Sequence, residues 1–262
     1  MKELIRSVLR RFGLDIVRYV RPEQRKSKRS RALTYFKTAT GNYYLPSDAV
    51  GDHIANAIKA GKTFDEEIVR EASKHIKPGT TVLDVGANFG QMSILFSNLV
   101  GETGKVYSFD ADDFVFEILT KNIQANERKD RIVPVFGAVH DVANETLFFP
   151  VQDFARFETY GSYGIDYNAT TGREVPSITI DSLDIAQPIS FMKVDVQGGD
   201  LQAMQGARKT IERNKMPIIF EYEYLFEDDY KLSFQEYVNF VQSVGYKFEK
   251  VINGYNYLIV PG

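Results

Sequence analysis

The sequence of 262 residues contains no cysteine and no tryptophan, and only three histidines. The absence of cysteine excludes a disulfide framework and thiolate catalysis, and it is compatible with a reducing compartment. His53, His75 and His140 lack the spacing of metal ligands, so we expect no metal site. The composition, with 44% hydrophobic and 26% charged residues, is ordinary for a soluble globular protein. The length is sufficient for one α/β domain with extensions.

Long apolar runs are also missing. No run approaches the ~20 residues of a transmembrane helix. Arginines interrupt the apolar positions at the N-terminus, where a signal peptide needs an unbroken apolar segment. We therefore expect a cytoplasmic protein. The net charge of −3 is divided unevenly, because residues 1–31 carry a net +8 and the remainder −11. The acidic remainder predicts that nucleic acid is not a partner.

The basic N-terminal segment has the pattern of an amphipathic helix. Its predicted apolar face consists of Leu4, Ile5, Val8, Leu9 and Phe12. The basic run RKSKRSR follows at 25–31. Two interpretations are open. The segment contacts the inner face of an anionic membrane, with about 1 kcal/mol contributed by each basic residue near the surface. Alternatively, it packs on the main domain or on a partner subunit of a homo-oligomer.

The segment 80–91 reads TTVLDVGANFGQ, which is typical of a strand, a glycine-rich turn and the start of a helix. Such a turn exposes backbone N–H groups and lets a ligand approach where a Cβ would block it. The spacing D-x-G-x-N-x-G differs from the dinucleotide fingerprint G-x-G-x-x-G. It resembles the nucleotide loop of Rossmann-like methyltransferases that use S-adenosylmethionine. In those enzymes the acid at the strand end, here Asp84, faces the methionine portion.

A second apolar strand, KVYSFD at 105–110, also ends in a carboxylate. Asp110 lies 26 residues after Asp84, near the ~20 expected between a nucleotide loop and its ribose-binding acid. A carboxylate there can accept hydrogen bonds from both ribose hydroxyls. Alternatively, Asp110 caps the helix that follows. The two features together favour a nucleotide-type ligand.

The rest of the chain alternates between predicted strands and helices. We expect a hairpin at 33–46 and strands at 81–85, 105–110, 132–139, 191–196 and 217–223. We expect helices at 54–76, 90–100, 112–126 and 234–245, and one more from the end of the strand at 191–196 to about 214. A polar and aromatic insertion follows 139, and strands 246–251 and 255–260 form a terminal hairpin around Asn253-Gly254. This alternation predicts an α/β fold with a mostly parallel, Rossmann-like sheet, helices on both faces and a C-terminal antiparallel hairpin.

Another strand ends in acids and glycines, in the run ISFMKVDVQGGD at 189–200, and PIIFE follows at 217–221. With these runs the chain resembles the FkbM-type methyltransferases. Their pattern joins V-D-V-G-A-N-x-G to K-x-D-V-E-G-A-E and then to P-x-x-x-E. Residues 83–90, 193–200 and 217–221 match these elements in order and spacing, and 177–183 resembles the family's segment before the second run.

The resemblance covers 51–260. It implies an S-adenosylmethionine-binding methyltransferase domain over 51–262, preceded at 1–50 by the basic amphipathic arm and a short hairpin. It also implies O-methyl transfer to a hydroxyl of a sugar, glycolipid or related polysaccharide intermediate, which would be the partner of this protein. The sequence departs from the family at two places. The family's E-G-A-E becomes QGGD from Gln197, whose amide cannot accept a proton as a base would, and F-E-P becomes Phe109-Asp110-Ala111, which shortens the carboxylate's reach.

Methyl transfer to an alcohol needs alignment of the acceptor and a base for its proton. Asp195, at the end of the fourth parallel strand, is the first candidate for the base, and Glu221 on the next strand is the second. Lys193 alternates with Met192 and either points into the site or forms a structural ion pair with Asp195. We therefore assign Asp195, Glu221 and Lys193 as the catalytic candidates.

The remaining predicted site residues form two groups. The cofactor group is Asp84, Gly86, Ala87, Asn88, Gly90, Gln91, Asp110, Ala111 and Ala138. The substrate group is Tyr160, Ser162, Tyr163, Gln197 and Glu223. The tyrosines belong to the insertion RFETYGSYG at 156–164, whose aromatic faces suit sugar rings, although a surface loop with incidental tyrosines gives the same pattern.

Two other functions compete with methyl transfer. One is a nicotinamide-dependent oxidoreductase on the same architecture, against which the missing G-x-G-x-x-G and the run at 193–200 both speak. The other is a non-catalytic binding module, for which Gln197 is the only hint. The presence of Asp84, Gly86, Gly90 and Asp110 speaks against such a module.

Overall fold

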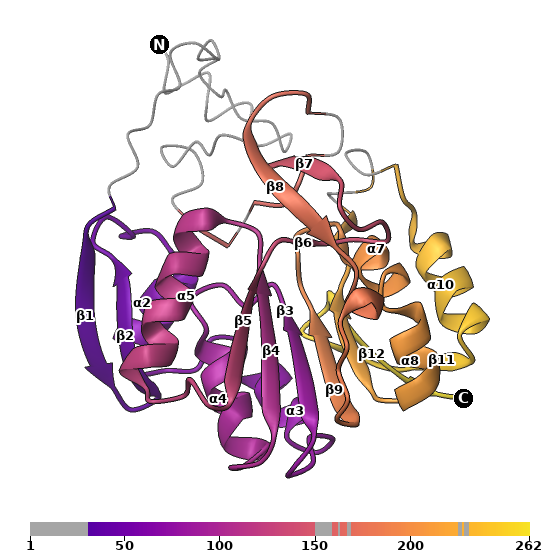
Figure 1. Ribbon diagram of the computed structural model, residues 1–262, viewed down its shortest axis with the longest axis horizontal. Coiled ribbons are helices and arrows are strands. Elements are labelled where there is room, and N and C mark those ends of the chain that lie inside the picture. Colours follow the sequence, from indigo (N-terminus) through magenta and orange to yellow (C-terminus); the bar gives the residue numbers. More distant parts are fainter. Residues whose placement is uncertain (1–30, 150–158, 162, 167–168, 225–226, 228–230) are drawn as a thin grey trace, which may run out of the picture.

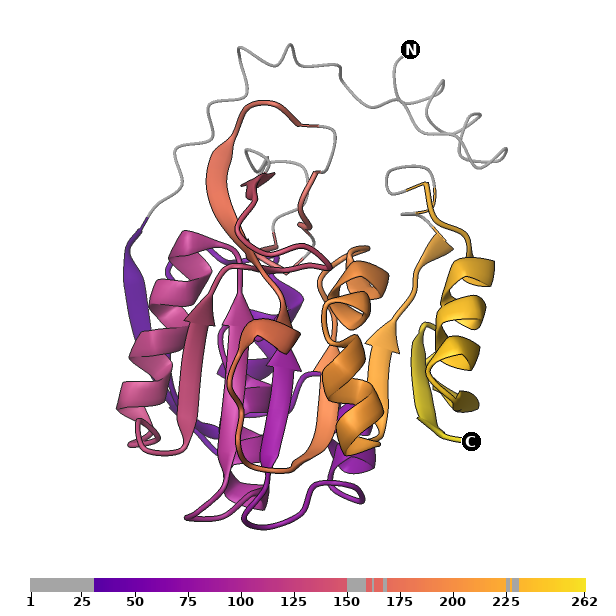
Figure 2. The same cartoon turned by 45° about the vertical axis from the view of Figure 1, so that its right-hand side comes forward.

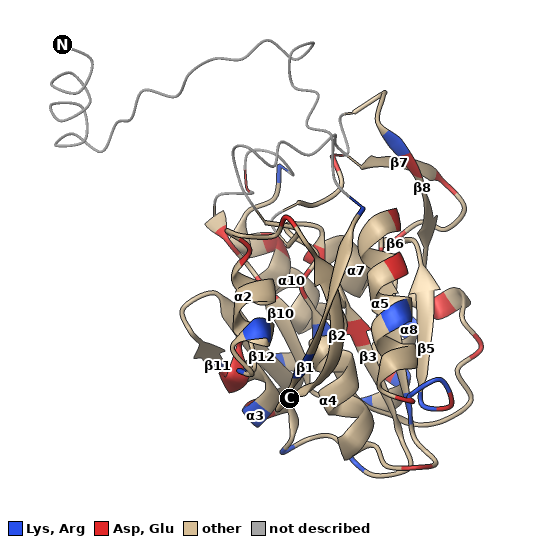
Figure 3. Cartoon of the chain, turned by 90° about the vertical axis from the view of Figure 1, so that its left-hand side faces the viewer, with Lys and Arg blue, Asp and Glu red and all other residues tan. Residues whose placement is uncertain are grey.

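The computed structural model describes residues 31–149, 159–161, 163–166, 169–224, 227 and 231–262. The predicted N-terminal helix and all of the basic run except Arg31 lie outside these residues. Among the described residues, no helix is both long and apolar enough to cross a bilayer. Acidic and basic residues are interspersed along the described helices and strands (Figure 3).

The centre of the molecule is a seven-stranded sheet with the order β11-β12-β10-β9-β3-β4-β5 (Figure 1). Its strands are β3 (Thr81–Val85), β4 (Lys105–Asp110), β5 (Ile132–Phe136), β9 (Ile189–Val194), β10 (Ile218–Glu221), β11 (Tyr246–Ile252) and β12 (Asn256–Pro261). The pairs β3–β4, β4–β5, β3–β9 and β9–β10 are parallel, whereas β12 runs antiparallel to both β10 and β11. The predicted α/β fold, with a mostly parallel sheet and a C-terminal antiparallel hairpin, is confirmed.

Helices cover both faces of this sheet, as predicted. They are α2 (His53–Lys59), α3 (Glu66–Ala72), α4 (Gln91–Leu99), α5 (Asp113–Ala125), α7 (Asp200–Gln205), α8 (Arg208–Asn214) and α10 (Phe234–Ser243), with a short 3₁₀ turn, η2 (Ile180–Ser182). Successive strand residues point to opposite faces. Val82 therefore packs in one cluster with α2 to α5, and Leu83 packs in another with α7, α8 and α10.

Two predicted helices are interrupted. The helix expected over 54–76 divides into α2 and α3, because the chain between them passes through left-handed backbone at Gly61 (φ 69°) and Asp65 (φ 48°). The helix after β9 divides into α7 and α8 at Gly206. A Cβ at Gly206 would lie 1.9 Å from the carbonyl oxygen of His140, so only glycine permits this approach.

The strand predicted over 132–139 is also divided. It breaks at Gly137 (φ 147°), after which the chain leaves the central sheet. The following strand belongs to a small sheet of order β6-β8-β7, built from β6 (Ala138–Val139), β7 (Thr146–Phe149) and β8 (Arg173–Ile178). This small sheet, which the sequence did not predict, lies above the carboxyl ends of the central strands (Figure 2).

The predicted N-terminal hairpin is present as β1 (Leu33–Thr38) and β2 (Gly41–Pro46). It packs beside α5, and two asparagines, Asn122 in α5 and Asn126 at its C-terminal end, form hydrogen bonds with backbone groups of β2. Asn122 accepts a hydrogen bond from the Tyr44 N–H (2.6 Å) and donates to the Tyr44 carbonyl (3.2 Å). Asn126 accepts from the Asn42 N–H (2.9 Å). Tyr43 in β2 is fully buried in the same cluster as Val82, so the hairpin shares the core of the main domain.

Candidate functional site

A pocket of about 1040 Å³, which includes the part open to solvent, lies at the carboxyl ends of β3, β4 and β9. This is the edge at which parallel α/β sheets bind their ligands. Its walls come from the glycine turn after β3, the turn after β4, the small sheet and the residues after β9. Of the nine predicted cofactor residues, Gly90 does not line the pocket, and the other eight do: Asp84, Gly86, Ala87, Asn88, Gln91, Asp110, Ala111 and Ala138.

The glycine turn is fixed by its neighbours in the sheet. The N–H groups of Gly86 and Ala87 both donate to the carbonyl of Phe109 (3.0 and 2.8 Å). A Cβ on Gly86 would lie 1.8 Å from the carbonyl oxygen of Asp195, and one on Gly90 would lie 2.6 Å from Cδ1 of Leu119. Both glycines have positive φ. The first glycine therefore lets the end of β9 come close, and the second lets α5 pack, which the sequence did not indicate.

Asp110, at the tip of β4, accepts the Asn88 N–H on one carboxylate oxygen and the Asp112 N–H on the other, both at 2.9 Å. Each oxygen keeps a second lone pair for a ligand. Burial raises the pKa of Asp110 to about 7. Asp110 is not the cap of α5, because Asp112 accepts the N–H groups of Phe114 and Val115 instead. The alternative role for Asp110 as the cap of this helix is therefore wrong.

The side chains of Asp84 and Gln91 are held by hydrogen bonds to other parts of the chain. Asp84 is fully buried and accepts the Ser93 hydroxyl at 2.5 Å, while burial raises its pKa. Gln91 accepts the Phe64 N–H (2.9 Å) and donates to the Lys62 carbonyl (2.8 Å). It thereby holds the loop between α2 and α3, which carries Asp65 to the pocket wall.

Lys193 joins the ends of β3 and β9 beneath the pocket. Its ammonium donates to the Gly86 carbonyl (2.8 Å) and lies 3.2 Å from Oδ2 of Asp195 and 3.9 Å from Oδ1 of Asp84. Only 3% of Lys193 is exposed. Burial lowers its pKa, but the charges of Asp195 and Asp84 outweigh this and raise the pKa to about 12. The structural ion pair is therefore present, and a catalytic role for Lys193 stays a prediction.

Asp195, Gln197 and Glu221 form a hydrogen-bonded group beside Lys193. The amide of Gln197 donates to Oδ1 of Asp195 (2.9 Å) and to Oε2 of Glu221 (2.8 Å). Burial raises the pKa of Asp195, but Lys193 and the hydrogen bonds from Gln197 and Glu221 bring the pKa below its usual value. Burial and the negative charges of Asp195 and Asp200 raise the pKa of Glu221 well above its usual value. The ammonium of Lys193 lies 3.2 Å from Asp195, so at neutral pH Asp195 is the anion of the pair, and Glu221 carries a proton.

The residues predicted to bind substrate lie at different depths. Tyr160 and Tyr163 line the pocket, but only 5% of Tyr160 is exposed, and its hydroxyl donates to Asp48 (3.1 Å). The Tyr160 N–H donates to the buried carboxylate of Asp52 (2.7 Å), which places this tyrosine as a fixed wall. Ser162 lies outside the described residues. Glu223 borders a smaller cavity of about 280 Å³ that Glu221 also lines.

Sequence reasoning missed several residues of the pocket. Asp65 was hidden in the helix predicted over 54–76, and Phe149 lay in an insertion with no predicted strand. The pair Asp112-Asp113, which follows Ala111, was the one available signal for Asp112, since a helix cap is expected there. In the part of the chain that the structure describes, no group of three or more acids and histidines is arranged to hold a metal ion.

Comparisons with known proteins agree on one class of enzyme. The model of the methyltransferase FkbM domain matches residues 84–248. A ubiquinone/menaquinone biosynthesis C-methyltransferase, UbiE, from Paraburkholderia phymatum is 28% identical over 107 residues, which are 41% of this chain and 38% of that protein. The chain therefore matches well under half the length of this curated relative.

Two solved structures are similar at lower sequence identity. The methyltransferase FkbM from Methylobacillus flagellatus has a TM-score of 0.45 and 15% identity, over 73% of this chain and 49% of that one. An S-adenosylmethionine-dependent O-methyltransferase from Thermotoga maritima has a TM-score of 0.47 and 12% identity, over 87% of this chain and 77% of that one.

The residues of the pocket fit the cofactor that a methyltransferase requires. Each carboxylate oxygen of Asp110 keeps a second lone pair for a ribose hydroxyl, and Asp84 and the turn that begins at Gly86 line the same pocket. The family model spans Asp84, Asp110, Asp195 and Glu221, and it covers more than half of the chain. This chain belongs to the FkbM family of S-adenosylmethionine-dependent methyltransferases.

Proposed function

We propose that this protein transfers a methyl group from S-adenosylmethionine to a hydroxyl of a sugar, glycolipid or related polysaccharide intermediate. The observation that carries the proposal is the ionised carboxylate of Asp195 in the pocket wall, 3.2 Å from the ammonium of Lys193 and hydrogen-bonded by Gln197. An anionic acceptor beside the glycine turn suits a substrate that must lose a proton, as a hydroxyl does.

The cofactor supplies the methyl group, and the residues of the chain bind, align and accept a proton. Asp110 and the turn that begins at Gly86 would hold the nucleoside part. The acceptor hydroxyl would donate its hydrogen bond to Asp195. As the hydroxyl oxygen gains its new bond, its proton becomes far more acidic than a carboxylic acid, so a carboxylate of low pKa is a sufficient base. Glu221, which holds its own proton, would act as a hydrogen-bond donor to Asp195.

The negative charges near Asp195 favour an acceptor that carries no charge of its own. Asp65 and Glu223 lie near enough to Asp195 that its negative charge contributes to raising the pKa of both, after burial. The pKa of Tyr255 is raised for the same reasons, with the charges of Asp65, Glu221 and Glu223 contributing. An anionic group on the acceptor would be repelled here, so a phosphate-linked glycolipid would need to keep its phosphate outside.

The test is a panel of acceptors offered to the full-length protein with S-adenosylmethionine, with release of S-adenosylhomocysteine as the signal. Neutral sugar glycosides should be methylated on oxygen, as located by NMR, and uronic acids of the same ring should react more slowly. The Asp195→Asn variant is the control for background release. Methylation on carbon or nitrogen, or a preference for uronic acids, would contradict the proposal.

The two competing functions are now weaker. Membership of a methyltransferase family speaks against a nicotinamide-dependent oxidoreductase. The Gln197 amide, which hinted at a non-catalytic module, holds the two candidate acids together. We further propose that the protein works in the cytoplasm and that its basic arm contacts the inner face of an anionic membrane. Packing of the arm on a partner subunit remains the alternative.

A further inference from the structure

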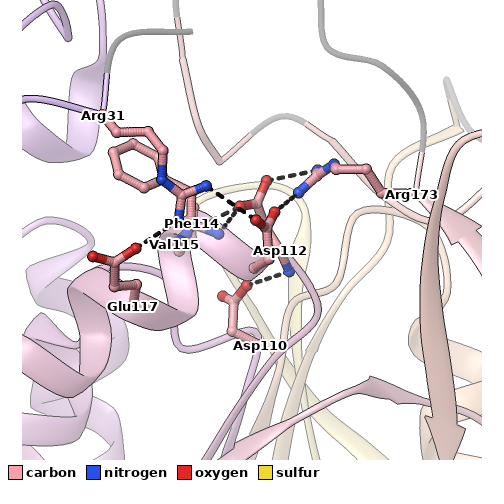
Figure 4. Close-up of polar contacts among 8 residues, drawn as sticks. Arg31, Asp110, Asp112, Phe114, Val115, Glu117 and Arg173 are labelled. Carbon is pink, nitrogen blue, oxygen red and sulfur yellow. Dashed lines mark hydrogen bonds and ion pairs between the residues drawn. The ribbon is translucent and has the colours of Figure 1, made fainter.

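Two arginines converge on the N-terminal end of α5 (Figure 4). Arg173, the first residue of β8, donates to the carboxylate of Asp112 (2.9 Å) and forms an ion pair with Asp113. Arg31 lies on the other side of Asp113, at 3.2 Å, and also pairs with Glu117 (2.5 Å). Asp113 is thus shared by both arginines, but only Arg173 reaches Asp112.

The contact between Arg173 and Asp112 leads directly to the predicted ribose acid. Asp112 is buried, its side chain caps α5, and its N–H donates to Oδ1 of Asp110 (2.9 Å). The turn from Asp110 to Asp112 forms one wall of the pocket. The carboxylate of Asp112 is only 3% exposed and the side chain of Arg173 is 32% exposed, so water screens this charge-assisted contact less than it screens a fully exposed ion pair.

Arg173 also holds the opposite wall. Its guanidinium lies over the ring of Phe149, 4.8 Å from the ring centre. Phe149 in β7 and Ala138 in β6 both line the pocket, and they pack together with Val175 of β8 in a small cluster of their own. This cluster is separate from the two large cores and contacts the central sheet through Phe136 of β5 and Ala111 after β4, so the ion pair of Arg173 adds a polar contact to a small apolar one.

Arg31 provides a natural comparison. It binds the same helix end, and its guanidinium likewise lies over an aromatic ring, that of Phe114, at 4.8 Å. Its side chain is 54% exposed, and none of its partners Asp113, Phe114 and Glu117 lines the pocket. Exposed ion pairs contribute little to stability.

We propose that Arg173 is a positioning residue of the cofactor pocket. By joining β8 and the ring of Phe149 to Asp112, it fixes the distance between the wall that carries Asp110 and the wall formed by the small sheet. The distance between these two walls affects how tightly the adenosine part of S-adenosylmethionine binds. The proposal rests on the cofactor assignment and is independent of the acceptor.

The test is calorimetric titration of the full-length protein and its Arg173→Met and Arg31→Met variants with S-adenosylhomocysteine and with adenosine. Arg173→Met should raise both dissociation constants roughly tenfold, within the range typical of residues that act through others. Arg31→Met should leave them unchanged. Arg173→Lys, which keeps the charge but loses the fork of donors, should fall between. In turnover, the KM for S-adenosylmethionine should rise with little change in kcat.

Four results would overturn the proposal. Unchanged affinity in Arg173→Met would show that the pocket walls are fixed without it. Equal losses in Arg31→Met would assign the effect to general stability of α5. A loss for S-adenosylhomocysteine but none for adenosine would move the effect to the other half of the ligand. Finally, an unaltered protein that binds neither ligand would overturn the cofactor assignment as well, whereas failure of every sugar acceptor would not affect this proposal.

Discussion

Replacing each of the two neighbouring carboxyl groups, Asp195 and Glu221, by its amide should lower kcat to very different extents. Asp195→Asn and Glu221→Gln change size very little, so they test charge. Burial and neighbouring anions raise the pKa of Glu221 well above its usual value, whereas Lys193 and the hydrogen bonds from Gln197 and Glu221 hold the pKa of Asp195 below its usual value in spite of burial. Near neutral pH, Asn therefore replaces an anion at 195, and Gln replaces a protonated acid at 221.

The magnitudes follow from these states. Asp195→Asn removes the acceptor of the substrate proton, and loss of a general base typically lowers kcat by about 10²–10⁴-fold. That factor corresponds to about 3–5 kcal/mol of transition-state stabilisation. In Glu221→Gln, the amide N–H₂ can still donate to Asp195 as the carboxylic acid does. The change is then limited to one neutral hydrogen bond, so kcat should fall by less than about tenfold.

The assay is release of S-adenosylhomocysteine at saturating cofactor and acceptor between pH 6 and pH 9. Calorimetry with S-adenosylhomocysteine serves as the control, because both variants should keep their cofactor affinity. The reasoning is refuted if Glu221→Gln loses as much activity as Asp195→Asn. It is also refuted if kcat of the unaltered protein rises through neutral pH and this rise disappears in Glu221→Gln, since Glu221 would then be the base.

Four further predictions concern binding and stability. Asp110→Ala should weaken S-adenosylhomocysteine binding by at least roughly tenfold in calorimetry, because the two ribose hydroxyls lose their acceptor; unchanged affinity would remove Asp110 from the site. Burial raises the pKa of Asp200 to about 7, so its contribution to stability is present below about pH 4 and lost as the pH rises through 7. In chemical denaturation, the free energy of unfolding of Asp200→Asn should therefore rise relative to that of the unaltered protein by on the order of 3 kcal/mol between pH 5 and pH 8. A difference that stays constant with pH would contradict this. Lys193→Met leaves the buried carboxylate of Asp84 and the partly exposed carboxylate of Asp195 without their cation, and it should lower the free energy of unfolding by about 3–5 kcal/mol, seen as a fall of roughly 10 °C in Tm, with partial recovery on adding Asp84→Asn. Removing residues 1–30 should abolish sedimentation with anionic vesicles at low salt but leave turnover of a water-soluble acceptor intact, and a full-length protein that ignores such vesicles would favour packing of the arm.

Local sequence signals were sufficient for the main elements. The apolar run before Asp84, the glycine turn and the following helix form one strand–turn–helix unit whose residues lie close in the sequence. The second acid, Asp110, ends the next strand, and both side chains reach one pocket because parallel strands end at the same edge of a sheet. The coverage of both faces of the sheet by helices follows from the same alternation of elements.

Long-range contacts decided where predicted elements broke. The sequence around Gly206 continues a helical pattern, but the carbonyl of His140 occupies the space that any side chain there would need. Gly86 reads as a ligand-binding glycine, yet the atom that would meet its Cβ is the carbonyl oxygen of Asp195. Neither neighbour is visible in the local pattern, because each lies more than 60 residues away.

The sequence by itself determined the α/β fold, the family and three of the acids that line the pocket, Asp84, Asp110 and Asp195, since these depend on patterns within single strand–helix units. Only the tertiary structure decided which acid carries a proton and which side chains hold the pocket walls. Glu221 keeps its proton beside the anionic carboxylate of Asp195, because two neighbouring strands bring the two carboxyl groups together around Gln197. Arg173 contacts Asp112, which lies 61 residues earlier in the sequence, because the fold brings the start of β8 beside the start of α5. Protonation and positioning depend on distance and burial, and the packed chain alone sets both.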